Sequence, residues 1–213
     1  MNIVTELQKK DHAGWWNPEL HLLAMFIHGI MPTINTVVEI GVQTGGSADV
    51  WLRFVPADGM YVGVDLNLYD PKQGLYAAMD GVRVRFATDS RVNLLIADST
   101  KQATLKSVIG ILNQRPVDFL FIDGFHSTEV ALSDYRMYSP LVRSGGIIAI
   151  HDATANLNVK RAIDEIVDVY YLNADGSAGY LPPHPGKTGQ PFSHVVRIDS
   201  KERHCGIIAL VKE

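Results

Sequence analysis

The chain has only one cysteine, Cys205, among its 213 residues. A lone thiol cannot form an internal disulfide, so the disulfide-stapled class of small secreted proteins is excluded. No apolar run reaches the roughly 18 residues that a membrane-spanning helix needs, and residues 1–11 lack the apolar segment of a signal peptide. These absences favour a cytoplasmic protein that crosses no membrane.

An excess of positive charge is also missing. The formal net charge is −4, with 19 Lys and Arg against 23 Asp and Glu. Basic runs interleaved with aromatic residues are absent as well, so neither nucleic acid nor an anionic membrane surface is expected as a partner. The length and the 46% hydrophobic content fit one ordinary domain that spans residues 1–213.

Five apolar runs each end at, or just before, a polar residue that can take part in chemistry. These residues are Glu39, Asp65, Asp98, Asp123 and the pair His151 and Asp152. Continuous apolar runs are typical of strands buried in a parallel sheet, and ligands bind at the carboxyl ends of such strands. One acid at a strand end could simply cap a helix, but the repeated pattern predicts a shared ligand site.

The run that ends at Glu39 leads into a glycine-rich turn at residues 41–46 (GVQTGG) and a helix that starts near Ser47. The dinucleotide-binding fingerprint requires glycine at position 43, which is Gln here, and no Walker-type Gly-Lys-Ser/Thr follows. The turn resembles motif I of the class I S-adenosylmethionine-dependent methyltransferases. An ordinary strand–turn–helix is the structural alternative.

A second group of polar residues is predicted at the ends of two neighbouring strands. If the strands before Asp123 and His151 are adjacent, their ends lie about 5 Å apart, and Asp152 joins them. Carboxylates suit a hard cation such as Mg²⁺, and imidazole extends the choice to Mn²⁺ or another transition metal. His126, with an ordinary pKa of about 6.5, could act as a base at neutral pH. Capping by Asp123 and solvated histidines are the structural alternatives.

These segments also resemble a narrower branch of the superfamily. Residues 121–126 (FIDGFH), a following helix that carries Asp134, and residues 141–152 (LVRSGGIIAIHD) are similar to the family that groups macrocin-type sugar O-methyltransferases and cephalosporin hydroxylase-like proteins. The resemblance covers about residues 35–170. It implies an α/β fold with a doubly wound, mostly parallel seven-stranded sheet, helices on both faces and an antiparallel C-terminal edge pair.

The resemblance implies a site as well. Asp123 and Asp152 would hold a divalent metal with His151 as a further ligand, although relatives usually carry a carboxylate at position 151. His126 would be the catalytic base beside Asp123. The residues that would bind S-adenosylmethionine are Glu39, Gly41, Gly45, Gly46, Ser47, Asp65, Asp98, Ser99 and Asp123.

Spacing and turn residues predict the remaining elements. Within an N-terminal helical segment at residues 1–34, a helix begins at Pro18 and ends before Pro32. A helix over residues 128–142 is expected to end at a glycine pair. Residues 173–190, rich in Gly and Pro, predict a long loop that could order over a ligand, and two strands are expected to follow it.

The sequence therefore predicts an S-adenosylmethionine-dependent methyltransferase that acts on a hydroxyl group of a small sugar or natural-product-like molecule, with a divalent metal as a further participant. A homodimer is the base-rate expectation. Two alternatives stay open: a cephalosporin hydroxylase-like metal-dependent oxidoreductase, and a cofactor-binding protein without catalytic activity. The sequence does not identify the methyl acceptor.

Overall fold

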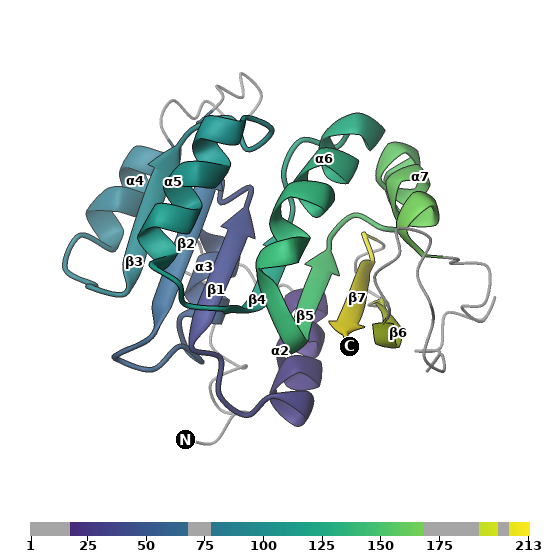
Figure 1. Ribbon diagram of the computed structural model, residues 1–213, viewed down its shortest axis with the longest axis horizontal. Coiled ribbons are helices and arrows are strands. Elements are labelled where there is room, and N and C mark those ends of the chain that lie inside the picture. The colour runs from purple at the N-terminus through teal and green to yellow at the C-terminus, as the bar shows by residue number, and fades with distance from the viewer. Residues whose placement is uncertain (1–17, 68–77, 168–191, 200–204) are drawn as a thin grey trace.

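A computed structural model describes residues 18–67, 78–167, 192–199 and 205–213. These residues contain a seven-stranded sheet with the order β3-β2-β1-β4-β5-β7-β6, which Figure 1 shows from one face. Strands β1 to β5 pair in parallel, whereas β7 runs antiparallel to both β5 and β6. The predicted sheet is confirmed. Its strands are β1 (Thr36–Ile40), β2 (Met60–Asp65), β3 (Val92–Ile96), β4 (Val117–Ile122), β5 (Val142–Ile150), β6 (Phe192–Ile198) and β7 (Ile207–Lys212).

Helices cover both faces of the sheet and enclose two apolar cores (Figure 1). Strand β4 contributes side chains to both cores, because successive side chains of a strand point to opposite faces of the sheet. Phe119 and Phe121 pack toward α2 and α3, whereas Leu120 and Ile122 pack toward the other face. The helices are α2 (Pro18–Ile30), α3 (Gly46–Trp51) and α4 (Ala78–Arg85) on the first face, and α5 (Gln102–Leu112), α6 (Thr128–Tyr138) and α7 (Leu157–Ile166) on the second.

One predicted boundary is wrong. The helix expected over residues 128–142 ends at Tyr138, a short 3-10 turn η1 (Ser139–Leu141) follows, and Val142 already belongs to β5. The glycine pair therefore lies inside a strand, where the register between β4 and β5 shifts. Gly145 has φ +72°, a left-handed conformation that glycine adopts without a steric cost. The pair accommodates an irregular strand rather than the end of a helix.

Of the other predicted elements, one helix is confirmed and one loop lies outside the described residues, and the structure also contains a helix that was not predicted. Helix α2 confirms the predicted helix that begins at Pro18. The expected loop at 173–190 lies outside the described residues. Helix α4 was not predicted, because few apolar residues mark it: Met79 and Val82 pack with Val42 in a small separate cluster. Among the described helices, none combines the length and the hydrophobicity that a bilayer crossing requires.

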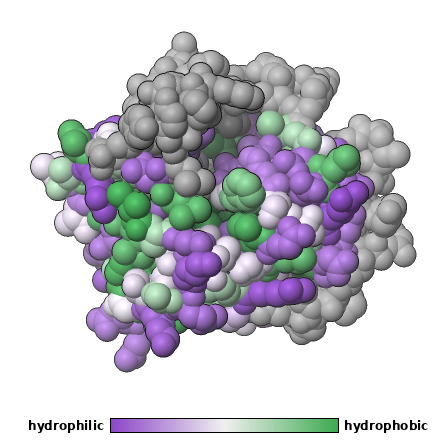
Figure 2. Space-filling view, turned by 90° about the horizontal axis from the view of Figure 1, so that it is seen from above, coloured by the Kyte–Doolittle hydropathy of each residue, from purple (hydrophilic) through white to green (hydrophobic). Residues whose placement is uncertain are grey.

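The order of the strands reverses between β1 and β4, and at such a switch point a crevice forms at the carboxyl ends of the strands. The strand ends are joined by backbone hydrogen bonds of 2.8 Å, from Gly41 N–H to the Val64 carbonyl and from Asp123 N–H to the Ile40 carbonyl. This edge is uppermost in Figure 1, and Figure 2 views it from above, where both hydrophilic and hydrophobic residues lie on its described part. The fold therefore brings the predicted acids to one rim.

Candidate active site

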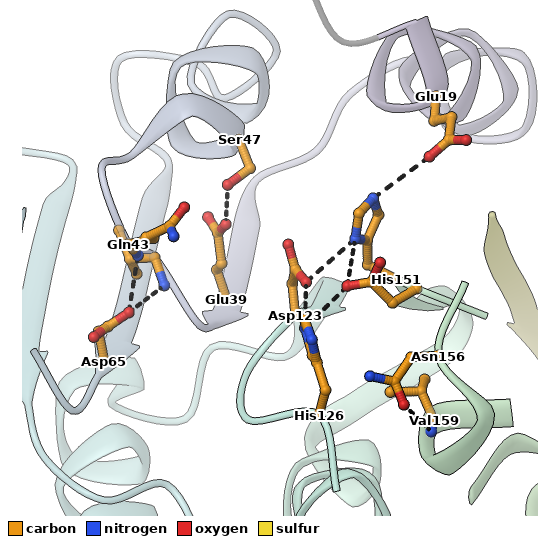
Figure 3. A network of polar contacts seen from close by, with 12 residues as sticks. Glu19, Glu39, Gln43, Ser47, Asp65, Asp123, His126, His151, Asn156 and Val159 are labelled. Atoms are coloured by element: carbon orange, nitrogen blue, oxygen red, sulfur yellow. Dashed lines mark hydrogen bonds and ion pairs between the residues drawn. The ribbon is translucent and has the colours of Figure 1, made fainter. Parts of the chain in front are cut away.

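The glycine-rich turn after β1 is held by the acid at the end of β2. One carboxylate oxygen of Asp65 accepts hydrogen bonds from the backbone N–H groups of Val42, at 2.9 Å, and Gln43, at 2.8 Å (Figure 3). Gln43 has φ +47°, the left-handed region that glycine would favour at this point of the dinucleotide fingerprint. The backbone thus forms a tight turn even though the second glycine of the fingerprint is absent.

Acidic groups continue along this rim to the end of β3. The second carboxylate oxygen of Asp65 accepts from Asn67 N–H at 2.6 Å. Asp98 accepts from the hydroxyl and the N–H of Thr100, at 2.6 Å and 2.9 Å, and these bonds hold the pKa of Asp98 below its ordinary value. Both carboxylates are only partly buried, so their remaining lone pairs can accept from the hydroxyl or amino groups of a ligand.

Glu39 lies below the turn and is completely buried. One of its oxygens accepts a hydrogen bond from the Ser47 hydroxyl (Figure 3) and the other accepts from the Tyr61 hydroxyl. Glu39 thus ties the start of α3 to β1 and β2. Burial raises the pKa of Glu39 to about 8, against the opposing effect of these two hydrogen bonds. The structure thus gives Glu39 a supporting position, and direct contact of Glu39 and Ser47 with a cofactor stays a prediction.

Arg85, from α4, supports the same turn and was missed in the sequence. Its guanidinium donates to the carbonyls of Thr44, at 3.1 Å, and Gly45, at 3.0 Å, and lies 3.6 Å from the Asp49 carboxylate. Gly45 adopts φ +77° and a side chain there would collide with the guanidinium. A basic residue in an unpredicted helix carries no sequence signal for such a contact.

The second polar group lies across the switch point, at the ends of β4 and β5. His126 Nε2 lies 2.9 Å from an oxygen of Asp152 and 3.5 Å from Asp123. His151 Nδ1 lies 3.2 Å from the same oxygen of Asp123 and 3.3 Å from Asp152 (Figure 3). Asp152 has φ +56°, a left-handed conformation that Asp adopts more readily than most other residue types. The predicted convergence of Asp123 with His151 and Asp152 is therefore present, and His126 lies beside the same two carboxylates.

The two carboxylates control the protonation of the two histidines. Hydrogen bonds to Asp123 and Asp152 raise the pKa of His126 to about 10. Burial lowers the pKa of His151, but Asp123, Asp152 and Glu19 outweigh it and raise that pKa to about 12. In this arrangement both imidazoles are protonated at neutral pH. The ordinary pKa of about 6.5 therefore does not apply to His126 beside these two acids, and its role as the base stays a prediction.

The donor set of this group suits a divalent cation. Asp123, His126 and Asp152 each place one ligand atom within 4.8 Å of the others. The predicted set contained His151 in place of His126, and His151 Nδ1 faces the same two carboxylates. Carboxylate oxygens alone would suit Mg²⁺, whereas the added imidazole nitrogens extend the choice to Mn²⁺ or a similar transition-metal ion. A cation there would replace the imidazolium protons that pair the carboxylates here.

Asp134, from α6, is a fully buried acid beneath this group. With His126 and His151 it lines a small pocket below the turn after β4. Burial raises the pKa of Asp134 to about 7, and the Ser99 side chain acts in the opposite direction. Contact of Ser99 with a cofactor stays a prediction.

Replacement of Asp134 with Asn is expected to remove a loss of stability at high pH. The folded state keeps this proton up to about pH 7, whereas the unfolded chain releases it near the ordinary value of 3.8. Stability is therefore lost as the pH rises through this window, by up to about 4 kcal/mol. The variant should match the wild type below about pH 3.8, where both states hold the proton, and its melting temperature should exceed that of the wild type increasingly up to pH 8. Parallel melting curves across this range would contradict the assignment.

Comparisons with known proteins agree with this geometry. A family model described as a methyltransferase domain matches residues 38–153, just over half of the chain. An O-methyltransferase from Bacillus cereus, solved in complex with SAH, has 18% identity and a TM-score of 0.56 over 99% of this chain and 87% of its own. The O-methyltransferase TomG from Streptomyces achromogenes, in complex with SAM, has 16% identity and a TM-score of 0.55 over 92% and 80%.

CalS11, described as a TDP-rhamnose 3'-O-methyltransferase of calicheamicin biosynthesis, has 15% identity and a TM-score of 0.53 over 77% of this chain and 73% of its own. At these identities the solved structures establish a shared fold. The family model runs from within β1 to just past the end of β5, and hence includes both polar groups at the carboxyl edge of the sheet. The chain therefore belongs to the family of methyltransferase-domain proteins.

Proposed function

We propose that this protein is an S-adenosylmethionine-dependent O-methyltransferase that acts on a small hydroxylated molecule with the help of a divalent metal. One observation carries the proposal: a row of acids, Asp65 and Asp98, adjoins the Asp123, His126 and Asp152 group across the switch point of the sheet. A site for a cationic nucleoside thus lies next to a site that can bind and deprotonate a hydroxyl.

The residues on the β1–β3 side fit S-adenosylmethionine. Its sulfonium and amino groups are cationic and its ribose hydroxyls are donors, which matches the partly exposed carboxylates of Asp65 and Asp98. Bound there, S-adenosylmethionine supplies an already activated methyl group. The protein's contribution is orientation, which can account for several kcal/mol of the barrier. Asp65 and Arg85 hold the glycine-rich turn in shape from two sides, and Glu39 supports it from below.

On the β4–β5 side the residues fit a hydroxylated acceptor. A divalent cation held by Asp123 and Asp152, with His126 or His151, would lower the pKa of an acceptor hydroxyl. The side chain of His126 is 43% exposed, so the imidazole borders the space open to an acceptor, and the proposed role of its Nε2 is to take the hydroxyl proton. Phe125, which precedes it, is 63% exposed and offers an apolar surface beside the base. The similar TDP-rhamnose methyltransferase CalS11 supports a sugar-like acceptor.

Calorimetry with S-adenosylhomocysteine tests the cofactor assignment directly. We expect saturable binding with an affinity tighter than about 1 mM, the weak end of the enzymatic range. The absence of binding at that concentration would remove the proposal. Detection of O-methylated product in a screen of sugars and small phenols would then separate methyl transfer from the oxidoreductase alternative, which instead consumes oxygen in the presence of iron.

Replacement of Asp65 with Ala is expected to weaken S-adenosylhomocysteine binding by at least about tenfold, because hydrogen bonds to a charged group contribute about 1.5–3 kcal/mol each. Asp58→Ala is the matched control, since Asp58 is exposed just before β2, at the opposite end of the same strand. The control should bind as the wild type does. Equal affinities of both variants would show that Asp65 does not contact the cofactor.

The remaining features of the proposal concern partners and location. A small-molecule acceptor without nucleic acid is consistent with the net charge of −4. A homodimer, a cytoplasmic location and a single domain over residues 1–213 stay predictions. Size-exclusion chromatography with light scattering would measure the oligomeric state.

A further inference from the structure

Glu19 lies far from the site in sequence but next to it in the fold. It stands in the first turn of α2 and is 0% exposed. One carboxylate oxygen lies 3.6 Å from His151 Nε2 (Figure 3), and the other accepts from Gly206 N–H at 3.3 Å. A fully buried carboxylate needs compensating partners. Glu19 therefore links α2 to the end of β5 and to the residue that precedes β7.

His151 is held on three sides by residues of different elements. The ring of Phe121, from β4, packs edge-on against the imidazole with centroids 6.1 Å apart. Nδ1 faces the carboxylates of Asp123 and Asp152, at 3.2 Å and 3.3 Å. Nε2 faces Glu19. The imidazole thus lies between a buried acid on one side and the candidate metal ligands on the other.

This arrangement matches a recurring property of metal-binding histidines. Such a histidine donates its second ring N–H to a carboxylate or carbonyl, which fixes the ring orientation and makes the ligating nitrogen more basic. Here the Glu19 carboxylate stands on the Nε2 side. When a cation takes the place of the Nδ1 proton, Glu19 would keep the other proton on Nε2 and leave the Nδ1 lone pair for the metal beside Asp123 and Asp152. The separation of 3.6 Å is an ion-pair distance, slightly longer than a direct hydrogen bond.

We propose that Glu19 is a positioning residue that orients His151, so that His151 Nδ1 becomes a nitrogen ligand to a divalent cation at Asp123 and Asp152. This inference rests on the metal site of the proposed function. It makes α2 part of the site, although α2 begins before the residues that the family model matches. The alternative is that Glu19 only ties α2 to Gly206 and stabilises the fold.

Mn²⁺ binding followed by electron paramagnetic resonance distinguishes these two roles. Pulsed spectra detect the nitrogen of a coordinated imidazole, and the signal that disappears in His151→Gln belongs to His151. In Glu19→Gln we expect this signal to weaken or vanish and the Mn²⁺ affinity to fall by about 10–100-fold. Glu19→Asp keeps the charge on a shorter side chain and should lie between the two.

Asp118→Asn is the matched control for loss of a buried carboxylate. Asp118 accepts from the backbone N–H groups of Asn35 and Thr36 and pairs with Arg143, at the amino ends of the strands and away from the site. This variant should lose thermal stability but keep the Mn²⁺ affinity and the His151 signal. If Glu19→Gln, or Glu19→Asp should the first variant not fold, behaves in the same way as Asp118→Asn, the positioning role is overturned.

Mn²⁺ binding by the wild type shows whether the metal site itself is wrong or only the positioning role of Glu19. A wild type that binds no Mn²⁺ would overturn the inference together with the metal part of the proposed function. S-adenosylhomocysteine binding on the same samples reports on the cofactor site separately. Wild-type Mn²⁺ binding that persists unchanged in both Glu19 variants would overturn the inference alone.

Discussion

Replacement of His126 with Gln is expected to lower kcat for O-methylation by about two to four orders of magnitude, the usual contribution of a positioned general base. Gln keeps a polar side chain of similar reach but cannot accept the acceptor proton. His126 Nε2 faces both Asp123 and Asp152, which places it at the proposed acceptor site. Because a base acts in the chemical step, the loss should appear in kcat. Binding of S-adenosylhomocysteine should be unchanged, because the predicted cofactor acids Asp65 and Asp98 lie across the switch point.

The pH dependence of the wild type gives this prediction its second readout. Only the neutral imidazole accepts a proton, and Asp123 and Asp152 hold the pKa of His126 at about 10. The rate should therefore rise with pH, by about tenfold per unit, throughout the range below that value. Added Mn²⁺ or Mg²⁺ should move the rise to lower pH, because positive charge beside the two carboxylates offsets the effect that raises the pKa. The slope should disappear in His126→Gln.

His194→Gln is the matched histidine control. His194 lies on β6 and contacts Ser193, so its replacement should leave kcat and the pH profile unchanged. Melting temperatures of both variants exclude unfolding as the cause of lost activity. A His126→Gln enzyme with wild-type kcat and an unchanged pH slope would show that another group takes the proton.

The sheet and the acids at its carboxyl edge could be predicted because each depends on residues that are neighbours in the sequence. Each strand is a short apolar run and each predicted acid follows its run directly, so Asp65 and Asp123 needed no tertiary information. The helix start at Pro18 is equally local, since proline at the first helical position leaves no hydrogen bond unmade. These features follow from periodicity and backbone chemistry alone.

What the sequence did not predict depends on contacts between distant segments. Glu19 is indistinguishable from an acid that favours the N-terminus of a helix, until the fold places it beside His151. The pKa of His126 depends on Asp152, which comes from another strand. The glycine pair that begins at Gly145 resembles a helix C-cap, and only its pairing with β4 shows that it belongs to a strand.

Replacement of Gly41 with Ala is expected to destabilise the fold by more than about 4 kcal/mol, a loss that few single substitutions reach. Gly41 has φ +90°, and an added Cβ would lie 2.0 Å from the Asp123 carbonyl oxygen and 2.4 Å from the carbonyl carbon. These are backbone atoms, so no side-chain rotation relieves the collision. The strand ends cannot separate without loss of the hydrogen bond from Asp123 N–H to the Ile40 carbonyl. Because Asp123 would move, Mn²⁺ binding should be lost along with stability.

A graded glycine series makes the steric cause measurable by urea denaturation. A Cβ at Gly124 would meet Asp134 and Ile40 at 3.4 Å, an ordinary contact, and a Cβ at Gly110 in α5 would meet nothing within 4 Å. Gly124→Ala should therefore cost far less than Gly41→Ala. Gly110→Ala should stabilise the protein by about 0.5–1 kcal/mol, because alanine favours the helix. If Gly41→Ala had the same urea midpoint as the wild type, the close approach of β1 and β4 at Gly41 and Asp123 would be wrong. The acids at the ends of these strands would then not share one rim.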